Sequence, residues 1–361
     1  MMKSLTIGIV GCGKFAEEHV NEIRKIDGTN VVAVCDKEEL MAQQLAERYS
    51  IPNHYTSLGA MCDNLKPDVI HIVTPPQTHL PLGRAACEHG SHIYVEKPFT
   101  VNYSEALELI DAATLHGRKV TVGHIYHFDP AALQMRKLIA TGILGDPVHI
   151  EAVMNYALEG EYGEAFLNNR KHWIYGLPGG LFQNVISHLA EKVLEFVPKE
   201  DPLVQVHSYL LNRKLREKRL NILDELRVIL AWEDVTASLT FSCNSRPIVS
   251  WLRIFGTRNT ISVDFNTRIV AVQHYLPTMI GKIIMGFNLG GQYYKSSFQN
   301  LAAFLRSDFH YMAGMNTLLR SFYSSIQSKG DPPIPYNDIL RTARIMDLIF
   351  DQLSCRQNSE T

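Results

Sequence analysis

Short apolar runs alternate with amphipathic segments from residue 5 to residue 123. The apolar runs cover 5–10, 30–36, 68–73, 92–95 and 119–123. The segments between them, which carry apolar side chains at helical spacing, cover 14–26, 38–49, 80–89 and 103–116. Runs that are apolar almost throughout are typical of strands buried on both faces of a parallel sheet. Strands and helices in this alternation predict βαβ units and an α/β domain with a doubly wound parallel sheet.

The pattern changes after residue 124. We expect helices at 130–140 and 180–196, with a strand at 147–154 and an irregular stretch up to residue 178 between them. Strands separated by short turns follow, at 203–211, 224–231, 235–242, 248–255, 259–264 and 268–273. The last part is again helical, at 294–306, 310–328 and 337–353. Consecutive strands predict an α+β domain with an open, mostly antiparallel sheet. We therefore expect one domain at 1–124 and a second at 125–361.

Composition agrees with a globular protein of two domains. The chain has 361 residues, which is more than one typical core accommodates. Hydrophobic residues make up 46% and charged residues 20%, and the net charge of −2 gives no basic footprint for nucleic acid. One basic run, RKLREKR at 213–219, is interpreted as a solvated loop or helix face.

Cysteine usage and hydropathy bear on location. The six cysteines show no CxxC spacing, which favours reduced thiols over disulfides. The first apolar run is too short for a signal peptide, and no stretch approaches the roughly 18–20 apolar residues of a membrane span. We expect a cytoplasmic protein.

Two late segments are interpreted as core and oligomer interface, with a partner surface as the alternative. They are the apolar, glycine-broken segment at 275–291 and the aromatic-rich segment at 309–323.

The segment GIVGCGKFA at 8–16 joins the first strand to the first helix. Gly11 and Gly13 allow a tight turn and a close approach of the backbone to a pyrophosphate, and Ala16 lets the helix pack near the strand. Asp36 ends the second strand, where an acidic side chain hydrogen-bonds ribose hydroxyls and repels a 2′-phosphate. This favours NAD(H) over NADP(H), a preference that the neighbouring Lys37 weakens.

Two further segments follow strands at the same edge of the sheet. Thr74, Pro75 and His79 come after the third strand, and Glu96-Lys97-Pro98 after the fourth. Ligands bind at the carboxyl edge of such sheets, so Lys97 is expected beside the nicotinamide. There its charge could polarise a carbonyl or bind a hydroxyl. The residues predicted to bind the cofactor are Gly11, Cys12, Gly13, Lys14, Phe15, Ala16, Asp36, Lys37, Thr74, Pro75, His79, Glu96 and Lys97.

Together these motifs resemble the Gfo/Idh/MocA family of oxidoreductases. The resemblance rests on the glycine turn, VCD at 34–36, TPPQTH at 74–79, VEKPF at 95–99, VGHIYHFDP at 122–130 and LPGGLFQNVISH at 177–188. It implies a Rossmann domain and hydride transfer between nicotinamide and a secondary alcohol or ketone carbon of a sugar, cyclitol or nucleotide sugar. It also implies an open C-terminal sheet that forms a dimer or tetramer.

The resemblance also implies catalytic residues. Lys97 matches the catalytic lysine of the family, and His188 matches the histidine of a Gly-Gly…Asp-x-x-x-His helix motif. Here Asn184 replaces that aspartate, and an amide cannot stabilise an imidazolium by charge. Three alternatives stay open: His188 acts alone with Lys97, Asn184 suits a different substrate, or the usual chemistry is lost.

The resemblance further places His124, His127 and Trp173 with Asn184 near the substrate, although a structural role is an equally good interpretation of each histidine. No histidine spacing indicates a metal site, and the family reaction needs no metal. Two other functions remain open. One is a relative that keeps NAD bound and uses transient oxidation to cleave a glycosidic bond. The other is a non-catalytic regulator that binds dinucleotide.

Overall fold

The computed structural model describes residues 4–159, 161–217, 222–307, 309–310 and 312–359. The chain divides into two compact units. The first comprises Met1–Ile125 and Gly314–Arg344, and the second Tyr126–Ala313 and Ile345–Thr361. The residues after 124 are therefore not all in one unit, because 314–344 pack with the first.

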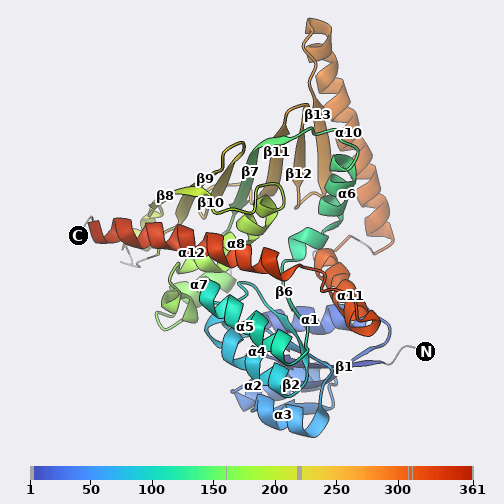
Figure 1. Cartoon of the computed structure of the whole chain (residues 1–361), viewed down its shortest axis with the longest axis vertical. Helices are drawn as coiled ribbons and strands as arrows, with labels where there is room; N and C mark the ends of the chain where they lie inside the picture. The colour runs from blue at the N-terminus through green and yellow to red at the C-terminus, as the bar shows by residue number, and fades with distance from the viewer. Residues whose placement is uncertain (1–3, 160, 218–221, 308, 311, 360–361) are drawn as a thin grey trace. The chain divides into compact units, whose positions relative to one another are not determined.

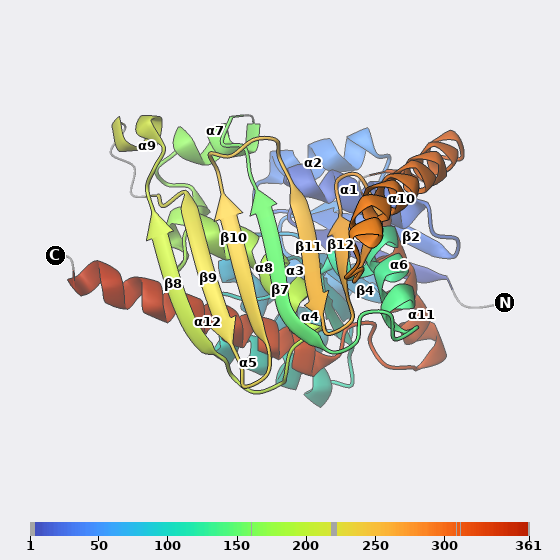
Figure 2. The same cartoon turned by 90° about the horizontal axis from the view of Figure 1, so that it is seen from above.

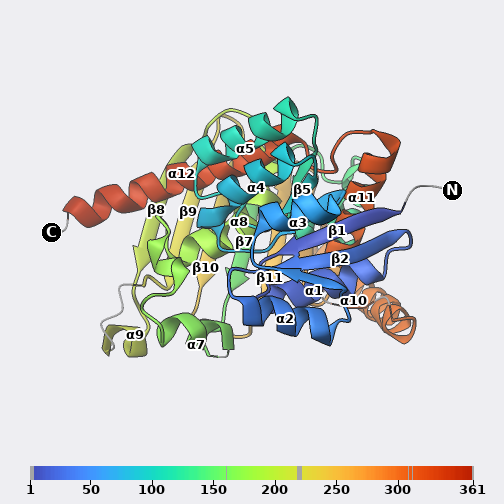
Figure 3. The ribbon, with the colours of Figure 1, turned by 90° about the horizontal axis from the view of Figure 1, so that it is seen from below.

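The first unit is built on six parallel strands in the order β3-β2-β1-β4-β5-β6. They are β1 (Leu5–Val10), β2 (Thr29–Cys35), β3 (Asn53–Tyr55), β4 (Val69–Ile72), β5 (His92–Val95) and β6 (Val120–Val122). Figure 3 shows α1 (Lys14–Arg24) and α2 (Glu39–Arg48) on one side of this sheet. On the other side lie α3 (Leu58–Leu65), α4 (His79–Glu88) and α5 (Tyr103–Leu115). The predicted doubly wound parallel sheet is confirmed.

The pattern of apolar residues missed β3, because a strand of three residues has no detectable periodicity. It also missed α3. The helix α11 (Ala313–Ser328) contributes Phe322 and Tyr323, which are 0% and 2% exposed. The Asn316 amide also donates to the Glu22 carbonyl on α1, at 3.2 Å. The part of the aromatic-rich segment that belongs to the first unit, 314–323, therefore contributes to its core.

The second unit is built on a seven-stranded sheet in the order β13-β12-β11-β7-β10-β9-β8 (Figure 2). Its strands are β7 (Pro147–Asn155), β8 (Leu203–Tyr209), β9 (Glu225–Ala231), β10 (Thr236–Ser242), β11 (Ser250–Gly256), β12 (Asn259–Asp264) and β13 (Ile269–His274). Every neighbouring pair is antiparallel except β7 with β10, which is parallel. The expectation of an open, mostly antiparallel sheet is confirmed.

Helices complete the second unit. They are α6 (Pro130–Ile139), α7 (Glu161–Leu167), α8 (Leu181–Leu194), α9 (Arg213–Glu217), α10 (Met279–Leu305) and the later part of α12 (Tyr336–Ser359). Every residue of α8 is buried, and α8 packs on β7 and β10. The basic run forms α9 as far as residue 217, with Arg213 exposed and paired to Glu217 at 2.7 Å. Residues 218–219 of that run lie outside the described residues.

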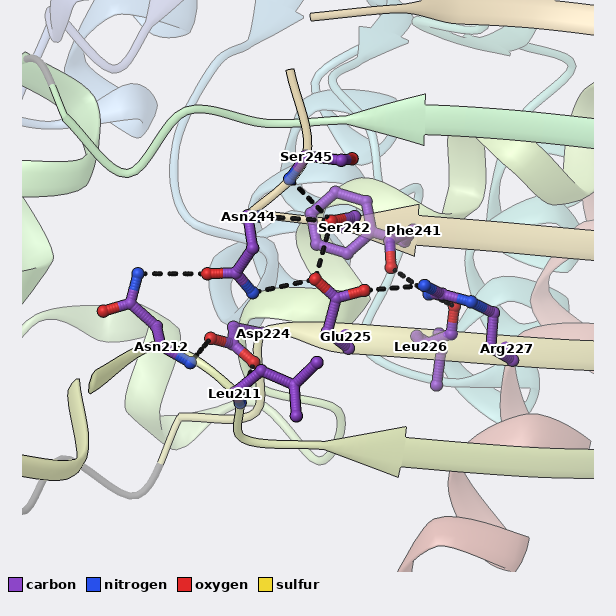
Figure 4. Close-up of polar contacts among 10 residues, drawn as sticks. All are labelled: Leu211, Asn212, Asp224, Glu225, Leu226, Arg227, Phe241, Ser242, Asn244 and Ser245. Atoms are coloured by element: carbon purple, nitrogen blue, oxygen red, sulfur yellow. Dashed lines mark hydrogen bonds and ion pairs between the residues drawn. The ribbon is translucent and has the colours of Figure 1, made fainter. Parts of the chain in front are cut away.

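Polar contacts tie the ends of β8, β9 and β10 together (Figure 4). The Glu225 carboxylate accepts hydrogen bonds from Ser242 at 2.6 Å, Asn244 at 2.8 Å and Arg227 at 2.8 Å. Burial raises the pKa of Glu225, but these hydrogen bonds outweigh it, so the net shift is downward. The carboxylate therefore stays ionised and fixes the strand ends.

The helix expected at 294–306 begins earlier in the chain than the sequence predicts. A helix was expected only at 294–306, but α10 is one helix over Met279–Leu305. Thr278 begins it by accepting a hydrogen bond from the Gly281 N–H at 3.0 Å. The segment is also not core, because Tyr275 and Phe287 are 78% and 80% exposed. Among the described residues, no helix has the length and apolar character needed to cross a bilayer.

Candidate active site

The glycine turn begins directly after β1. Gly11 has φ +95°, and a Cβ there would lie 2.6 Å from the Val73 carbonyl oxygen, so only glycine fits. Gly13 precedes the first residue of α1, and a Cβ there would meet nothing within 4 Å. No side chain caps α1 at Gly13. Open space therefore remains beside Gly13 at the start of α1, and the N-terminus of a helix is the end that favours a phosphate group.

Asp36 is held at this turn by two backbone groups. The Cys12 N–H donates to its Oδ2 at 2.7 Å, and the Glu38 N–H donates to its Oδ1 at 3.0 Å. A carboxylate has about four acceptor sites, so lone pairs remain for ribose hydroxyls. The predicted residues Gly11, Cys12, Gly13 and Asp36 thus lie together at the carboxyl ends of β1 and β2.

His79 joins the two loops that follow β4 and β5. Its Nε2 lies 2.8 Å from the Thr74 carbonyl oxygen, and its Nδ1 lies 3.1 Å from the carbonyl oxygens of Pro98 and Phe99. The ring is fully buried, and burial lowers its pKa. His79 therefore positions Thr74 and the Lys97-Pro98 segment, whose peptide bond is cis, rather than presenting its own ring to a ligand.

Glu96 is the end of a buried chain of hydrogen bonds. Its Oε1 lies 3.1 Å from His19 Nε2, and His19 Nδ1 lies 2.8 Å from His71 Nδ1. His71 Nε2 in turn lies 2.8 Å from the Tyr323 hydroxyl. Burial raises the pKa of Tyr323 and lowers that of His71, so a neutral hydroxyl can donate to a neutral ring.

One set of tautomers satisfies the whole chain. Tyr323 donates to His71, His71 donates to His19, and His19 donates to the Glu96 carboxylate. Glu96 Oε2 also accepts from the Lys97 N–H at 3.1 Å. The network thus fixes the backbone that carries Lys97, whose side chain is partly exposed. Sequence reasoning missed the contact between His19 and His71.

The helix α8 carries the second group of predicted residues. A Cβ on Gly179 would lie 2.3 Å from the Phe350 ring, and Gly180 has φ +52°, so the Gly-Gly pair is required by packing and by backbone conformation. Asn184 and His188 follow one turn apart, and each is 8% exposed. Their common face on one helix agrees with the spacing seen in the sequence.

Glu191 supplies a carboxylate next to His188. Its Oε1 lies 3.4 Å from His188 Nδ1, and Glu191 is 1% exposed. A carboxylate at Nδ1 orients the ring and favours the tautomer that carries its proton on Nδ1. The charge that Asn184 cannot provide is therefore present three residues after His188, on the same helix. The sequence HLAE contained this signal, because residues three apart are neighbours on a helix.

Lys192 is buried beside this pair. Its Nζ lies 3.7 Å from the centre of the Tyr126 ring and 4.4 Å from that of Phe265, and it donates to Ser250 Oγ at 2.8 Å. The Tyr126 ring meets His188 edge-on, with the ring centres 5.0 Å apart. Burial lowers the pKa of Lys192 to about 7, against opposing contributions from Glu191 and Asp129.

Other predicted substrate residues have structural contacts. His127 Nδ1 lies 2.9 Å from Arg136 and 3.6 Å from the Glu195 carboxylate. Trp173 is partly buried against the core of the second unit, and the buried His124 belongs to the first unit. The fold also brings possible ligand atoms of His127 and Glu191 within 4.8 Å, although their spacing gave no such indication. The expectation that no metal takes part stays a prediction.

The five cysteines whose side chains the structure describes are all free and buried, in agreement with reduced thiols.

Residues 5–124 match the profile of the family described as an oxidoreductase family with an NAD-binding Rossmann fold, Gfo/Idh/MocA. Residues 5–124 therefore form the NAD-binding Rossmann domain of this family of oxidoreductases. Among curated proteins, the chain is 24% identical to oxidoreductase P35 of Formosa agariphila, over 75% of this chain and 83% of that protein. It is 31% identical to inositol 2-dehydrogenase 4 of Saccharopolyspora erythraea, over 40% of this chain but only 44% of that enzyme.

Solved structures of other proteins share the fold over nearly the whole chain. The WlbA dehydrogenase of Bordetella pertussis, in complex with NADH and UDP-GlcNAcA, superposes with a TM-score of 0.78. The two proteins are 17% identical, and the match covers 97% of this chain and 95% of that one. At this identity the likeness establishes the architecture of both sheets and nothing finer.

Proposed function

We propose that this Gfo/Idh/MocA protein is an NAD-dependent dehydrogenase that acts on a secondary alcohol of a sugar-like substrate. The observation that carries the proposal is the buried pair of His188 and Glu191 on α8, 3.4 Å apart. A histidine oriented by a carboxylate is suited to take the proton of a hydroxyl, because its own protonation changes near neutral pH.

The cofactor site supports NAD(H) rather than NADP(H). Gly13 leaves room for a pyrophosphate at the start of α1, and the Asp36 carboxylate is fixed at the end of β2. A 2′-phosphate would lie against this negative charge. Lys37 is exposed and weakens the preference without removing it. NAD, when bound, would accept or return the hydride.

The chain's own groups would handle the proton and hold the substrate. His188 accepts the hydroxyl proton at Nε2 while Glu191 stabilises the imidazolium formed. Lys97 is the catalytic lysine that the resemblance implies, and the Glu96 carboxylate accepts a hydrogen bond from its backbone N–H. Asn184, His124, His127 and Trp173 are proposed to orient the substrate.

The substrate class is proposed from relatives. An inositol dehydrogenase is among the curated relatives, and a structure of similar fold contains UDP-GlcNAcA. Rings that bear several hydroxyl groups are common to both. We also propose, from the family resemblance, that the outer face of the C-terminal sheet serves in self-association.

The test is a screen of sugars, cyclitols and UDP-sugars, in which NADH fluorescence is followed with NAD and, separately, with NADP. A dehydrogenase accumulates NADH with its substrate, whereas an enzyme that recycles NAD to cleave a glycosidic bond releases a sugar without net NADH. With an active substrate, Lys97→Ala is expected to lower turnover by orders of magnitude while NADH still binds. Turnover near wild type in that variant would overturn the role of Lys97, and NADH binding without any turnover across the panel would favour a regulator.

A further inference from the structure

The helix α10 exposes an apolar face that is unusual for a helix packed on its own sheet. Its other face lies against β13, where the Gln292 side chain bonds both the N–H and the carbonyl oxygen of Val272, at 2.8 and 2.9 Å. Ser296 on the same face is buried. The polar face of α10 therefore packs inward and the apolar face points outward. Figure 1 shows the first turns of α10 extending beyond the end of β13.

A heptad pattern runs along the exposed face. Its positions, which alternate spacings of four and three, are Ile280, Ile284, Phe287, Gly291, Tyr294, Phe298, Leu301 and Leu305. The seven side chains among them are between 51% and 80% exposed. This spacing is that of the a and d positions of a coiled coil. Only Lys282 and Lys295 are charged in α10, and neither occupies one of these positions. Four further apolar side chains beside these positions are also exposed, namely Met279, Ile283, Tyr293 and Phe304.

The pattern is complementary to itself when two copies run antiparallel. A two-fold axis at the middle of the series pairs Ile280 with Leu305, Ile284 with Leu301, Phe287 with Phe298, and Gly291 with Tyr294. Each pair joins an a position to a d position, as antiparallel coiled coils require. Gly291, which has no side chain, faces the bulky Tyr294, so the small and large residues near the axis also match.

The area is sufficient for a stable pair. Seven large side chains that each expose on the order of 100 Å² would bury about 1,400 Å² between two copies. Stable interfaces bury roughly 1,200–2,000 Å². A membrane surface fits less well, because interfacial helices carry a water-facing side rich in lysine and arginine, whereas the polar side of α10 faces its own sheet.

We propose that α10 of one copy pairs antiparallel with α10 of a second copy, about a two-fold axis near Gly291. This interface is separate from the sheet face through which the family resemblance implies self-association. It does not depend on the catalytic activity.

The experiment uses cysteine pairs in the full-length chain, in a Cys355→Ser background. The double variant Ile284→Cys/Leu301→Cys, treated with a short bis-maleimide reagent, is expected to give a covalent dimer, because each cysteine meets its counterpart in the other copy. The single variants are expected to stay monomeric on denaturing gels, as is Lys282→Cys, which lies off the seam. A parallel pair would instead cross-link each single variant, and this result would overturn the proposal.

Oligomeric state gives an independent measurement. Phe287→Lys and Phe298→Lys each bury a lysine in the seam of the antiparallel pair. The double variant would in addition place the two lysines opposite each other. Both single variants are expected to halve the molar mass measured by light scattering, while Tyr275→Lys, outside the helix, leaves it unchanged. An unchanged mass in the seam variants would overturn the proposal. A wild-type monomer that floats with anionic lipid vesicles would instead identify α10 as a membrane-binding element.

Discussion

Replacing Glu191 by glutamine tests the pair on α8 directly. The carboxylate lies 3.4 Å from His188 Nδ1, and with an effective dielectric constant of about 20 its attraction for an imidazolium is about 5 kcal/mol. A glutamine retains a neutral hydrogen bond of about 1 kcal/mol. The nearby Lys192 and residual solvent offset part of the difference, so we expect a loss of about 2–3 kcal/mol from the transition state. This corresponds to roughly a 100-fold lower turnover.

Two measurements follow the change. With a substrate from the NADH screen, Glu191→Gln should lower kcat about 100-fold and leave the Kd for NADH unchanged, because Glu191 and the glycine turn lie in different units. Long-range ¹H–¹⁵N spectra of the histidine rings, assigned with His188→Asn, report the tautomer without any substrate. The wild type should carry the His188 proton on Nδ1, and Glu191→Gln should populate both tautomers.

The matched control is Asn184→Asp, which restores the carboxylate that the family motif carries one turn earlier. In the Glu191→Gln background it should recover part of the turnover if the missing element is a negative charge. Turnover within threefold of wild type in Glu191→Gln, together with an unchanged tautomer, would refute the assignment. His188 would then act without a carboxylate partner.

Other substitutions test the glycine turn and the buried lysine. Gly11→Ala places a Cβ 2.6 Å from the Val73 carbonyl oxygen and should cost about 2–4 kcal/mol in urea unfolding, whereas Gly13→Ala should fold normally and bind NADH more weakly. Equal stability of Gly11→Ala and wild type would contradict the close contact. Above pH 7 the folded protein releases the Lys192 proton while the unfolded chain, with a pKa near 10.5, keeps it, so the free energy of unfolding should rise with pH. The difference in free energy of unfolding between wild type and Lys192→Met should therefore change by about 1.4 kcal/mol per pH unit. Parallel stability curves for the two proteins from pH 7 to 8.5 would exclude this titration.

The sequence was sufficient for the elements that carry their own signal. Buried strands of the first sheet are apolar along their length, and the glycine turn is required by a local backbone conformation at Gly11. Both features depend on residues close together in the chain. The prediction failed at α10, because each glycine costs a helix only about 1 kcal/mol and the packing of Gln292 on β13 offsets that cost.

The site was predictable only in part. Lys97, His188 and Asp36 lie in motifs, whereas the contact of His19 with His71 and Tyr323 joins residues from three distant segments. No local pattern reports such a contact. Glu191 is different, because its position on the helix was readable, but the family motif directed attention to residue 184.

The first unit can be completed only late in synthesis, because it combines residues from two distant parts of the chain. That unit needs Gly314–Arg344, whose Tyr323 hydroxyl completes the chain of hydrogen bonds to Glu96. At about 5–20 residues per second, synthesis delays this segment by roughly 10–40 seconds after the sheet has emerged. During that interval His71 and the inner face of α1 lack their final cover. A fragment ending at residue 124 is therefore expected to expose apolar surface and to aggregate, whereas a permuted chain that joins 314–344 to 1–125 should fold by itself.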